Sequence, residues 1–291
     1  MIWTAAVWGV ICAREPFTTW LYHFAWWPLL LFLDGLLYLL KGESWLLSRP
    51  RELARLLAWS VTAWLFFEVY NLVLGNWRYV GMEPNFWLRW PGYALAFATV
   101  LPGILLTSQV LAALGAYQGV RGPGRDLGLW QPLFLILGVA SALLPLVLPR
   151  YAFPLIWLAF IFLLDPVLDL LDGESLTRRF AAGERQELLS LLTAGLLCGF
   201  WWEMWNYPAR AKWIYTLPVF NFWKVFEMPL LGYLGFLPFA LEAAVMYNFL
   251  NVLEKRYIIR PRQRRLFWLV QVAFWLAAFW AIDTWTVLSC R

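Results

Sequence analysis

Two carboxyl groups lie within long apolar segments of this sequence, and each is followed by an asparagine three residues later. Glu68 precedes Asn71, and Glu203 precedes Asn206. A spacing of three places both side chains of a pair on one face of a helix. A charged carboxylate at the centre of a bilayer costs about 2.5–3.5 kcal/mol on insertion scales. Such pairs are therefore typical of a proton donor or of an ion or substrate ligand, although a hydrogen-bond clamp between helices explains them equally well.

Aromatic residues surround both pairs, most densely the second. Trp and Tyr gather at membrane interfaces, so an interfacial belt explains many of them. Their ring faces also suit a flat unsaturated substrate or a developing carbocation, through cation–π attraction. We therefore predict a substrate-binding site built from both asparagines, from Glu227 and from four aromatic residues of the second half: Asn71, Asn206, Glu227, Trp202, Trp205, Trp213 and Tyr215.

The sequence offers little for a metal or another cofactor. Asp165, Asp169, Asp172 and Glu174 form an acidic run, and spaced aspartates hold magnesium in prenyl-diphosphate enzymes. A second aspartate motif is missing, so we expect a solvated helix end and loop there. The single histidine, His23, and three widely separated cysteines share no metal-ligand spacing. We predict no metal and no cofactor.

The segments that must position these groups are overwhelmingly apolar. Of 291 residues, 62% are hydrophobic and 14% are charged, whereas soluble domains run near 45–50% and 25%. This excess excludes a soluble domain, a disordered chain and a disulfide scaffold, and it predicts an all-α polytopic integral membrane protein. The net charge of +5 does not indicate nucleic acid as a partner, because the basic residues lie in short loops where they mark topology.

The chain contains an internal repeat. Residues 33–44 and 164–175 are identical at eight of 12 positions, including the final Gly-Glu-Ser. Similar blocks follow in the same order around both Glu–Asn pairs and around two later Trp-x-Tyr motifs. This order predicts two tandem four-helix repeats and an extra C-terminal helix, in residues 1–126, 127–260 and 261–291. Equivalent helices are an even number apart, so the repeats should be parallel, unlike the inverted repeats of many transporters.

Eight or nine transmembrane helices are expected. Apolar runs of spanning length occur at 17–40, 52–74, 91–117, 130–148, 151–171, 186–207, 228–253 and 266–288. The shorter run 1–13 matches 130–148 in the repeat, which favours a ninth span. Most of the 23 lysines and arginines fall in or beside four loops. The positive-inside rule then predicts a bacterial inner (plasma) membrane protein with these loops in the cytoplasm: 41–51, 118–129, 172–185 and 254–265.

A third carboxyl group within an apolar helix, Glu242, has no acidic counterpart in the first repeat. Duplicated proteins often keep a scaffold in both copies and specialise one, so this asymmetry favours the second repeat as the active half. We predict Glu68, Glu203 and Glu242 as catalytic residues. Asp283, near the end of the last helix, is expected to be a snorkelling polar group.

The second repeat resembles the membrane lycopene cyclases. The residues that carry the resemblance are Trp213-x-Tyr215, Phe226-Glu227-Met228-Pro229, Gly232-Tyr233-x-Gly235-Phe236 and Glu242. Those proteins consist of two similar helical halves, and they differ from this chain in having three helices per half and paired glutamates after the proline. The resemblance implies a cofactor-free cyclase that protonates an alkene and quenches a carbocation.

That chemistry requires a protonated carboxyl group, which an apolar pocket favours. Glu203 or Glu242 would donate the proton, and Glu68 would take it back. Two functions stay open: a protein that binds or acts on an apolar isoprenoid or lipid, and a non-catalytic subunit that stabilises a larger complex of integral membrane proteins. A transporter is a third alternative. Whether the protein is an enzyme is open.

Overall fold

The computed structural model describes residues 2–127 and 130–290. Four positions lie outside this part: Met1, residues 128 and 129 at the end of the predicted cytoplasmic loop 118–129, and Arg291. Within it the chain is mostly helical, and seven helical segments are long and apolar enough to cross a membrane. They are Leu21–Lys41, Pro50–Leu74, Phe86–Ala113, Pro149–Leu170, Gln186–Asn206, Leu230–Tyr257 and Pro261–Trp285. The length and composition of these helices make the chain an integral membrane protein.

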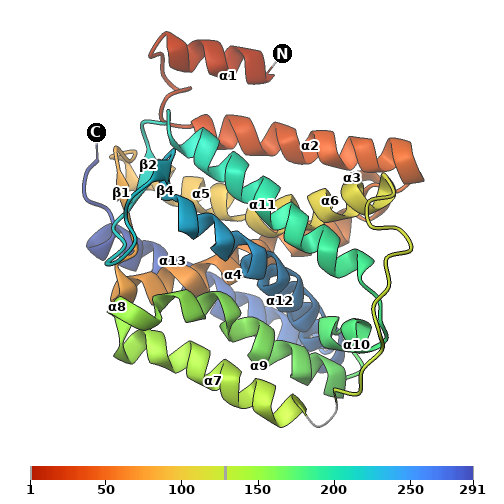
Figure 1. Cartoon of the computed structure of the whole chain (residues 1–291). Coiled ribbons are helices and arrows are strands. Elements are labelled where there is room, and N and C mark those ends of the chain that lie inside the picture. Colours follow the sequence, from red (N-terminus) through yellow and green to blue (C-terminus); the bar gives the residue numbers. More distant parts are fainter. Residues whose placement is uncertain (1, 128–129, 291) are drawn as a thin grey trace.

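The elements follow one another in a similar order in both halves of the chain (Figure 1). The first half contains α1 (Ile2–Ile11), α2 (Leu21–Lys41), α3 (Trp45–Ser48), α4 (Pro50–Leu74), β1 (Trp77–Val80), α5 (Phe86–Phe97) and α6 (Val100–Ala113). The remainder contains α7 (Gln131–Val147), α8 (Pro149–Ala152), α9 (Ile156–Leu170), α10 (Leu176–Ala181), α11 (Gln186–Asn206), β2 (Lys212–Tyr215), β3 (Lys224–Val225), β4 (Met228–Pro229), α12 (Phe236–Tyr257) and α13 (Pro261–Trp285), with 3-10 helices at Phe153–Leu155 and Leu230–Gly235.

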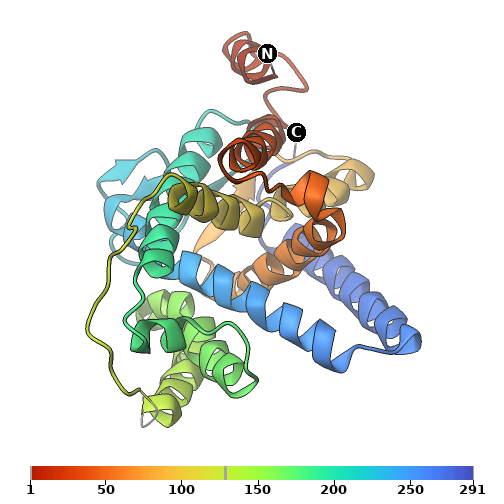
Figure 2. The same ribbon diagram turned by 90° about the vertical axis from the view of Figure 1, so that its right-hand side faces the viewer.

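The long helices extend from one end of the molecule to the other (Figure 1). Figure 1 shows α3 and α10 at one end, and β1, β2 and the C-terminus at the other. The helix α1 lies outside the bundle of the other helices, as both views show (Figures 1 and 2). It contacts α2. It has ten residues and is therefore about 15 Å long, half the thickness of a bilayer core. The expected ninth span over 1–13 is thus not formed by this helix alone.

The short helices α3 and α10 begin with the same arrangement. Ser44 and Ser175 are their N-caps. Asp34 accepts hydrogen bonds from the Ser44 hydroxyl and the Trp45 N–H, both at 2.6 Å. Asp165 accepts from the Ser175 hydroxyl at 3.0 Å and from the N–H groups of the next two residues. The two aspartates therefore fix the turn after each membrane helix.

The prediction of a solvated acidic run is wrong at its first position. Asp165 is completely buried, because its carboxylate satisfies the backbone donors at the start of α10. Asp169 binds Arg178 at 2.5 Å and the amide of Gln131 at 2.5 Å. Only Asp172 and Glu174 are largely exposed.

A small antiparallel sheet joins the two halves. Strands β1 and β2 lie in the loops after α4 and α11 and contain the two Trp-x-Tyr motifs of the internal repeat. They pair Trp77 with Tyr215 and Tyr79 with Trp213. The all-α prediction thus holds for the spanning segments but not for these loops. Pairing of the two strands satisfies their backbone N–H and C=O groups, which lie next to buried helix ends. Because it links residues far apart in sequence, the sheet fixes the two halves against each other at this end.

Candidate functional site

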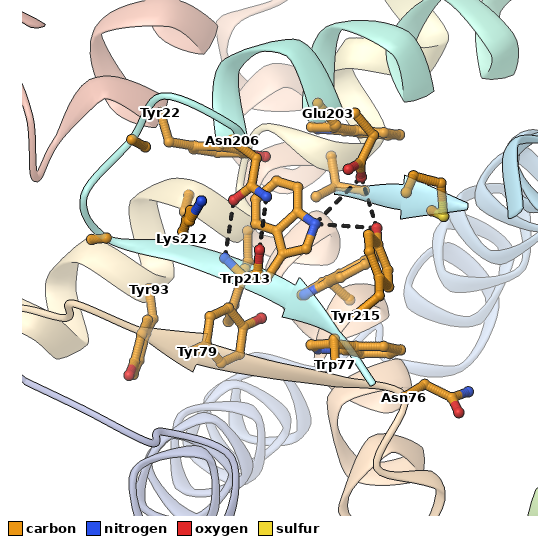
Figure 3. Close-up of a pocket in the computed structure, with 18 of the residues that line it drawn as sticks. Tyr22, Asn76, Trp77, Tyr79, Tyr93, Glu203, Asn206, Lys212, Trp213 and Tyr215 are labelled. Carbon is orange, nitrogen blue, oxygen red and sulfur yellow. Dashed lines mark hydrogen bonds between the residues drawn. The ribbon is translucent and has the colours of Figure 1, made fainter. Parts of the chain in front are cut away.

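An aromatic cavity of about 200 Å³ lies beneath the β1–β2 sheet (Figure 3). Its wall is contributed by both halves of the chain: α2, α4, α5, α9, α11, α12 and the two strands. Most of the wall surface is apolar. The aromatic residues of the wall include Trp20, Tyr22, Trp64, Trp77, Tyr79, Tyr93, Trp157, Trp202, Trp213, Tyr215, Phe236 and Phe239.

Glu203 and Glu83 both line this cavity, and Glu203 is the buried one. Its side chain is completely buried. Oε1 accepts hydrogen bonds from the Tyr215 hydroxyl at 2.7 Å and from the Trp213 indole at 3.3 Å (Figure 3). Oε2 has no hydrogen-bond partner among the described residues. One carboxyl oxygen is therefore held by two donors, while the other is buried without a hydrogen-bond partner in the described part of the chain.

Glu68, the aligned residue of the first half, is bound much more fully. Its Oε1 accepts from Tyr79 at 2.5 Å, from Trp64 at 2.8 Å and from Trp77 at 3.2 Å. Its Oε2 also lies 3.3 Å from the Trp77 indole nitrogen. The residues that line the cavity include these three donors but not Glu68 itself. Glu68 thus holds the cavity wall together and does not face the cavity.

The difference between the two glutamates has a local cause. Trp64 lies one turn before Glu68, and the aligned position one turn before Glu203 is Gly199. A Cβ atom at Gly199 would lie 2.1 Å from the ring of Phe236. The space that an indole occupies in the first half is filled in the second half by Phe236, which donates no hydrogen bond. The second glutamate consequently lacks the donor that Trp64 supplies to Oε1 of Glu68.

The two predicted asparagines bind backbone groups of the strands that follow them. Asn71 accepts from the N–H of Asn76 at 2.8 Å and donates to the Trp77 carbonyl at 2.9 Å. Asn206 accepts from the Trp213 N–H at 3.0 Å and donates to the Trp213 carbonyl at 2.8 Å (Figure 3). Each asparagine therefore positions a strand, and through it a tryptophan and a tyrosine that bind the glutamate.

The tyrosines of the two strands are permanent donors at ordinary pH. Burial raises the pKa of Tyr79 well above 10, and the nearby Glu68 adds to the increase. Burial likewise raises the pKa of Tyr215, with Glu203 as the next cause. Both phenols therefore keep their protons and donate to the carboxyl groups.

The other predicted site residues lie in different places. Trp202 lines the cavity, whereas Trp205 lies in a separate crevice between α1, α2 and α11. Glu227 binds Lys212 at 2.6 Å, and only Lys212 lines the cavity. Glu242 is completely buried between α12 and α9, where it accepts from the Phe160 N–H at 2.9 Å. Its carboxyl group is not part of the cavity wall.

The sequence did not predict several further polar residues around the cavity. His23 lines it, and so do Arg89 and Tyr93, which both bind Asp283 of α13. Asp283 accepts from the Arg89 guanidinium at 2.6 Å and 2.9 Å, and from Trp90 and Tyr93 at 2.8 Å each. The expectation that Asp283 only snorkels is therefore wrong. A signal was present for His23, since it is the single histidine and lies at the start of a spanning segment.

Comparison with known proteins supplies no relative. No family model matches the chain, and neither a curated protein nor a solved structure is significantly similar to it. In the described part of the chain, no group of three His, Cys, Asp or Glu residues is arranged to hold a metal ion. What the site can do therefore follows from its own geometry: an apolar, aromatic space with one anchored carboxyl group.

Proposed function

We propose that this membrane protein binds one end of an apolar isoprenoid or similar lipid in the aromatic cavity and that Glu203 acts on it as an acid. The observation that carries the proposal is the buried Oε2 atom of Glu203, which has no hydrogen-bond partner among the described residues and belongs to a largely aromatic wall. Flat ring faces favour an unsaturated chain, and they stabilise positive charge that develops on it. The weak likeness to the membrane lycopene cyclases agrees with this chemistry.

The hydrogen bonds of Glu203 determine where an acidic proton would sit. Oε1 already accepts from Tyr215 and Trp213. In the neutral carboxyl group Oε1 is therefore the carbonyl-type oxygen, and the proton is on Oε2. This places the O–H bond at the one unpartnered position of the group. A double bond that lies in the cavity would be protonated there.

The size of the cavity limits what it encloses. Pockets that surround a drug-sized ligand measure about 300–1,000 Å³, whereas this one measures about 200 Å³. It holds the end of a long chain and leaves the remainder in the bilayer. A ligand with a double bond near one end is therefore favoured.

Native mass spectrometry of protein extracted gently from its own membranes tests the binding. We expect a bound isoprenoid or polyene after release of small molecules. Replacing Glu203→Gln should leave folding and binding intact and abolish turnover of that compound, while Asn248→Gln, a change remote from the cavity, serves as the control. Product formation at the wild-type rate in Glu203→Gln would contradict the acid role.

The alternative is a non-catalytic subunit of a larger membrane complex. The complete hydrogen bonding of Glu68 favours it, because a saturated carboxyl group is a structural element. In that case the extracted protein should carry stoichiometric protein partners and only ordinary phospholipid. A transporter is less favoured, since the proposed repeats are parallel.

We also propose that the chain arose by duplication and that its basic loops are cytoplasmic, in a bacterial inner membrane. The matching contacts of Asp34 and Asp165, and of the two Glu–Asn pairs, support the duplication. The exposed thiol of Cys290 tests the orientation. Cys290 forms an isolated backbone β-bridge with Met82, close to β1, and therefore lies at the β1–β2 end of the molecule. A membrane-impermeant maleimide should label it in intact cells, and labelling only after lysis would contradict the orientation.

A further inference from the structure

We infer that His23 is the base that completes the reaction proposed for Glu203. Acid-catalysed rearrangement of an alkene needs two proton transfers, one to the substrate and one from it. The sequence favours Glu68 as the acceptor, but Glu68 is bound by three donors and does not line the cavity. His23 does line it. This inference rests on the proposed function.

The hydrogen bonding of His23 determines which nitrogen is basic. Nε2 lies 2.9 Å from the carbonyl oxygen of Gly92. A carbonyl oxygen only accepts, so Nε2 carries the hydrogen, and in the neutral ring Nδ1 keeps its lone pair. Nδ1 is buried and has no hydrogen-bond partner among the described residues. The wall of the cavity thus contains a fixed imidazole whose buried Nδ1 is an unused acceptor.

A chain of aromatic contacts links the base to the acid. The ring of Tyr22 lies 6.1 Å from that of His23 and 5.9 Å from that of Trp213, which binds Glu203. A simple shift of a double bond adds and removes protons at neighbouring carbons, for which one carboxyl group is enough. Two different groups suit removal of the proton at a more distant carbon, as cyclisation of an acyclic polyene requires.

The transfers balance without a further reactant. The O–H bond at Oε2 of Glu203 breaks, and the π electrons of the substrate form the new C–H bond. A carbocation remains, and a second π bond attacks it to close a ring and move the charge. A C–H bond next to the new cation then breaks, its electron pair forms a double bond, and the proton binds Nδ1 of His23. Return of this proton to Glu203 through solvent restores the site, and the net reaction is an isomerisation.

A suitable substitution of His23 removes the basic nitrogen but keeps the hydrogen bond that the ring makes to the Gly92 carbonyl. In His23→Gln the side-chain amide can still donate to the Gly92 carbonyl, but it has no basic nitrogen. The thermal stability of this variant in lipid nanodiscs should be close to that of the wild type. If it does not fold, His23→Asn provides a second variant that also lacks a base.

The test uses lycopene, an acyclic polyene, in nanodiscs prepared in D2O. The wild type should form a cyclic product that contains deuterium. Either His23 variant should form it at least about 100-fold more slowly. Its recovered lycopene should nevertheless carry deuterium at the protonated end, because Glu203 still adds a deuteron and takes back a proton. Glu203→Gln should give neither product nor label.

The possible results discriminate between the two proposals. Product formation by His23→Gln at the wild-type rate overturns the role of His23 and leaves that of Glu203 standing. Loss of both product and label in this variant also overturns it, because His23 would then be needed before the second transfer. Absence of product and label in the wild type contradicts the proposed function and this inference with it.

Discussion

The indole N–H of Trp64 donates a hydrogen bond of 2.8 Å to Glu68, one turn further along α4. At the aligned positions of α11 stand Gly199 and Glu203, and the ring of Phe236 fills the space beside the glycine. Oε1 of Glu68 thus accepts from three donors, whereas Oε1 of Glu203 accepts from two. The two halves keep the same tyrosine and tryptophan partners but bind their glutamates to different extents.

The two glutamates should differ in their contribution to stability. In Glu68→Leu three buried donors lose their acceptor, and each unsatisfied group costs about 1–3 kcal/mol. In Glu203→Leu the Trp213 indole can still donate to the Tyr215 hydroxyl, at 3.1 Å. We expect the first variant to lose more unfolding free energy by about 2 kcal/mol. Reversible unfolding in mixed micelles measures this, and equal losses would contradict the assignment of Glu68 as the clamp.

The tyrosines of the sheet predict a loss of stability at alkaline pH. Burial raises the pKa of Tyr79 and Tyr215 in the folded state, whereas unfolded tyrosine ionises near pH 10. Above that pH the unfolded chain loses protons that the folded chain keeps, so the free energy of unfolding falls as pH rises. At pH 11 the effect is about 1.4 kcal/mol for each phenol.

The double variant Tyr79→Phe/Tyr215→Phe isolates this contribution. Its stability relative to the wild type should improve between pH 9 and pH 11, because it has lost the two groups concerned. The comparison removes the titration of every other residue, which both proteins share. A difference that stays constant over this range would show that the two phenols ionise normally in the folded state.

The sequence predicted eight or nine spanning helices, of which seven in the described residues are long and apolar enough, while the run 130–148 forms the shorter helix Gln131–Val147. It predicted the site only in part. The length of an apolar run identifies a membrane helix without knowledge of its neighbours. The predicted membrane class is confirmed by the seven long apolar helices of the described residues. The pairing of Trp77 with Tyr215 depends on residues 138 positions apart in short strands, for which local sequence carries no signal. For the same reason the partners of His23 and Asp283 could not be predicted. The duplication, the orientation and the catalytic roles stay predictions.

The approach of α11 to α12 depends on Gly195. A Cβ atom there would lie 2.2 Å from the carbonyl oxygen of Phe236. Gly195→Ala should therefore push the helices apart and cost about 1–3 kcal/mol of unfolding free energy. Gly35→Ala is the matched control, because no atom lies within 4 Å of its added methyl group. Alanine stabilises a helix by up to about 1 kcal/mol relative to glycine, so a similar loss in both variants would contradict this packing argument.

The buried ion pair between Arg89 and Asp283 should anchor α13 to the cavity wall. Their side chains are 11% and 16% exposed, and the closest distance is 2.6 Å. Asp283→Asn leaves the guanidinium without its countercharge in a mostly buried place, which should cost on the order of 3 kcal/mol. Glu43→Gln is the control, since Glu43 and its partner Arg49 are 61% and 36% exposed, and its loss should stay below about 1 kcal/mol.

Salt distinguishes a buried pair from an exposed one. At 1 M salt the Debye length is about 3 Å, and exposed pairs are screened while buried pairs are affected much less. The cost of Asp283→Asn should therefore persist at 1 M salt, while the small cost of Glu43→Gln should vanish. A cost at Asp283 that disappears with salt would mean that Arg89 reaches solvent, and α13 would then be held by its other contacts, among them the hydrogen bonds of Thr62 with Gln271 and Trp275.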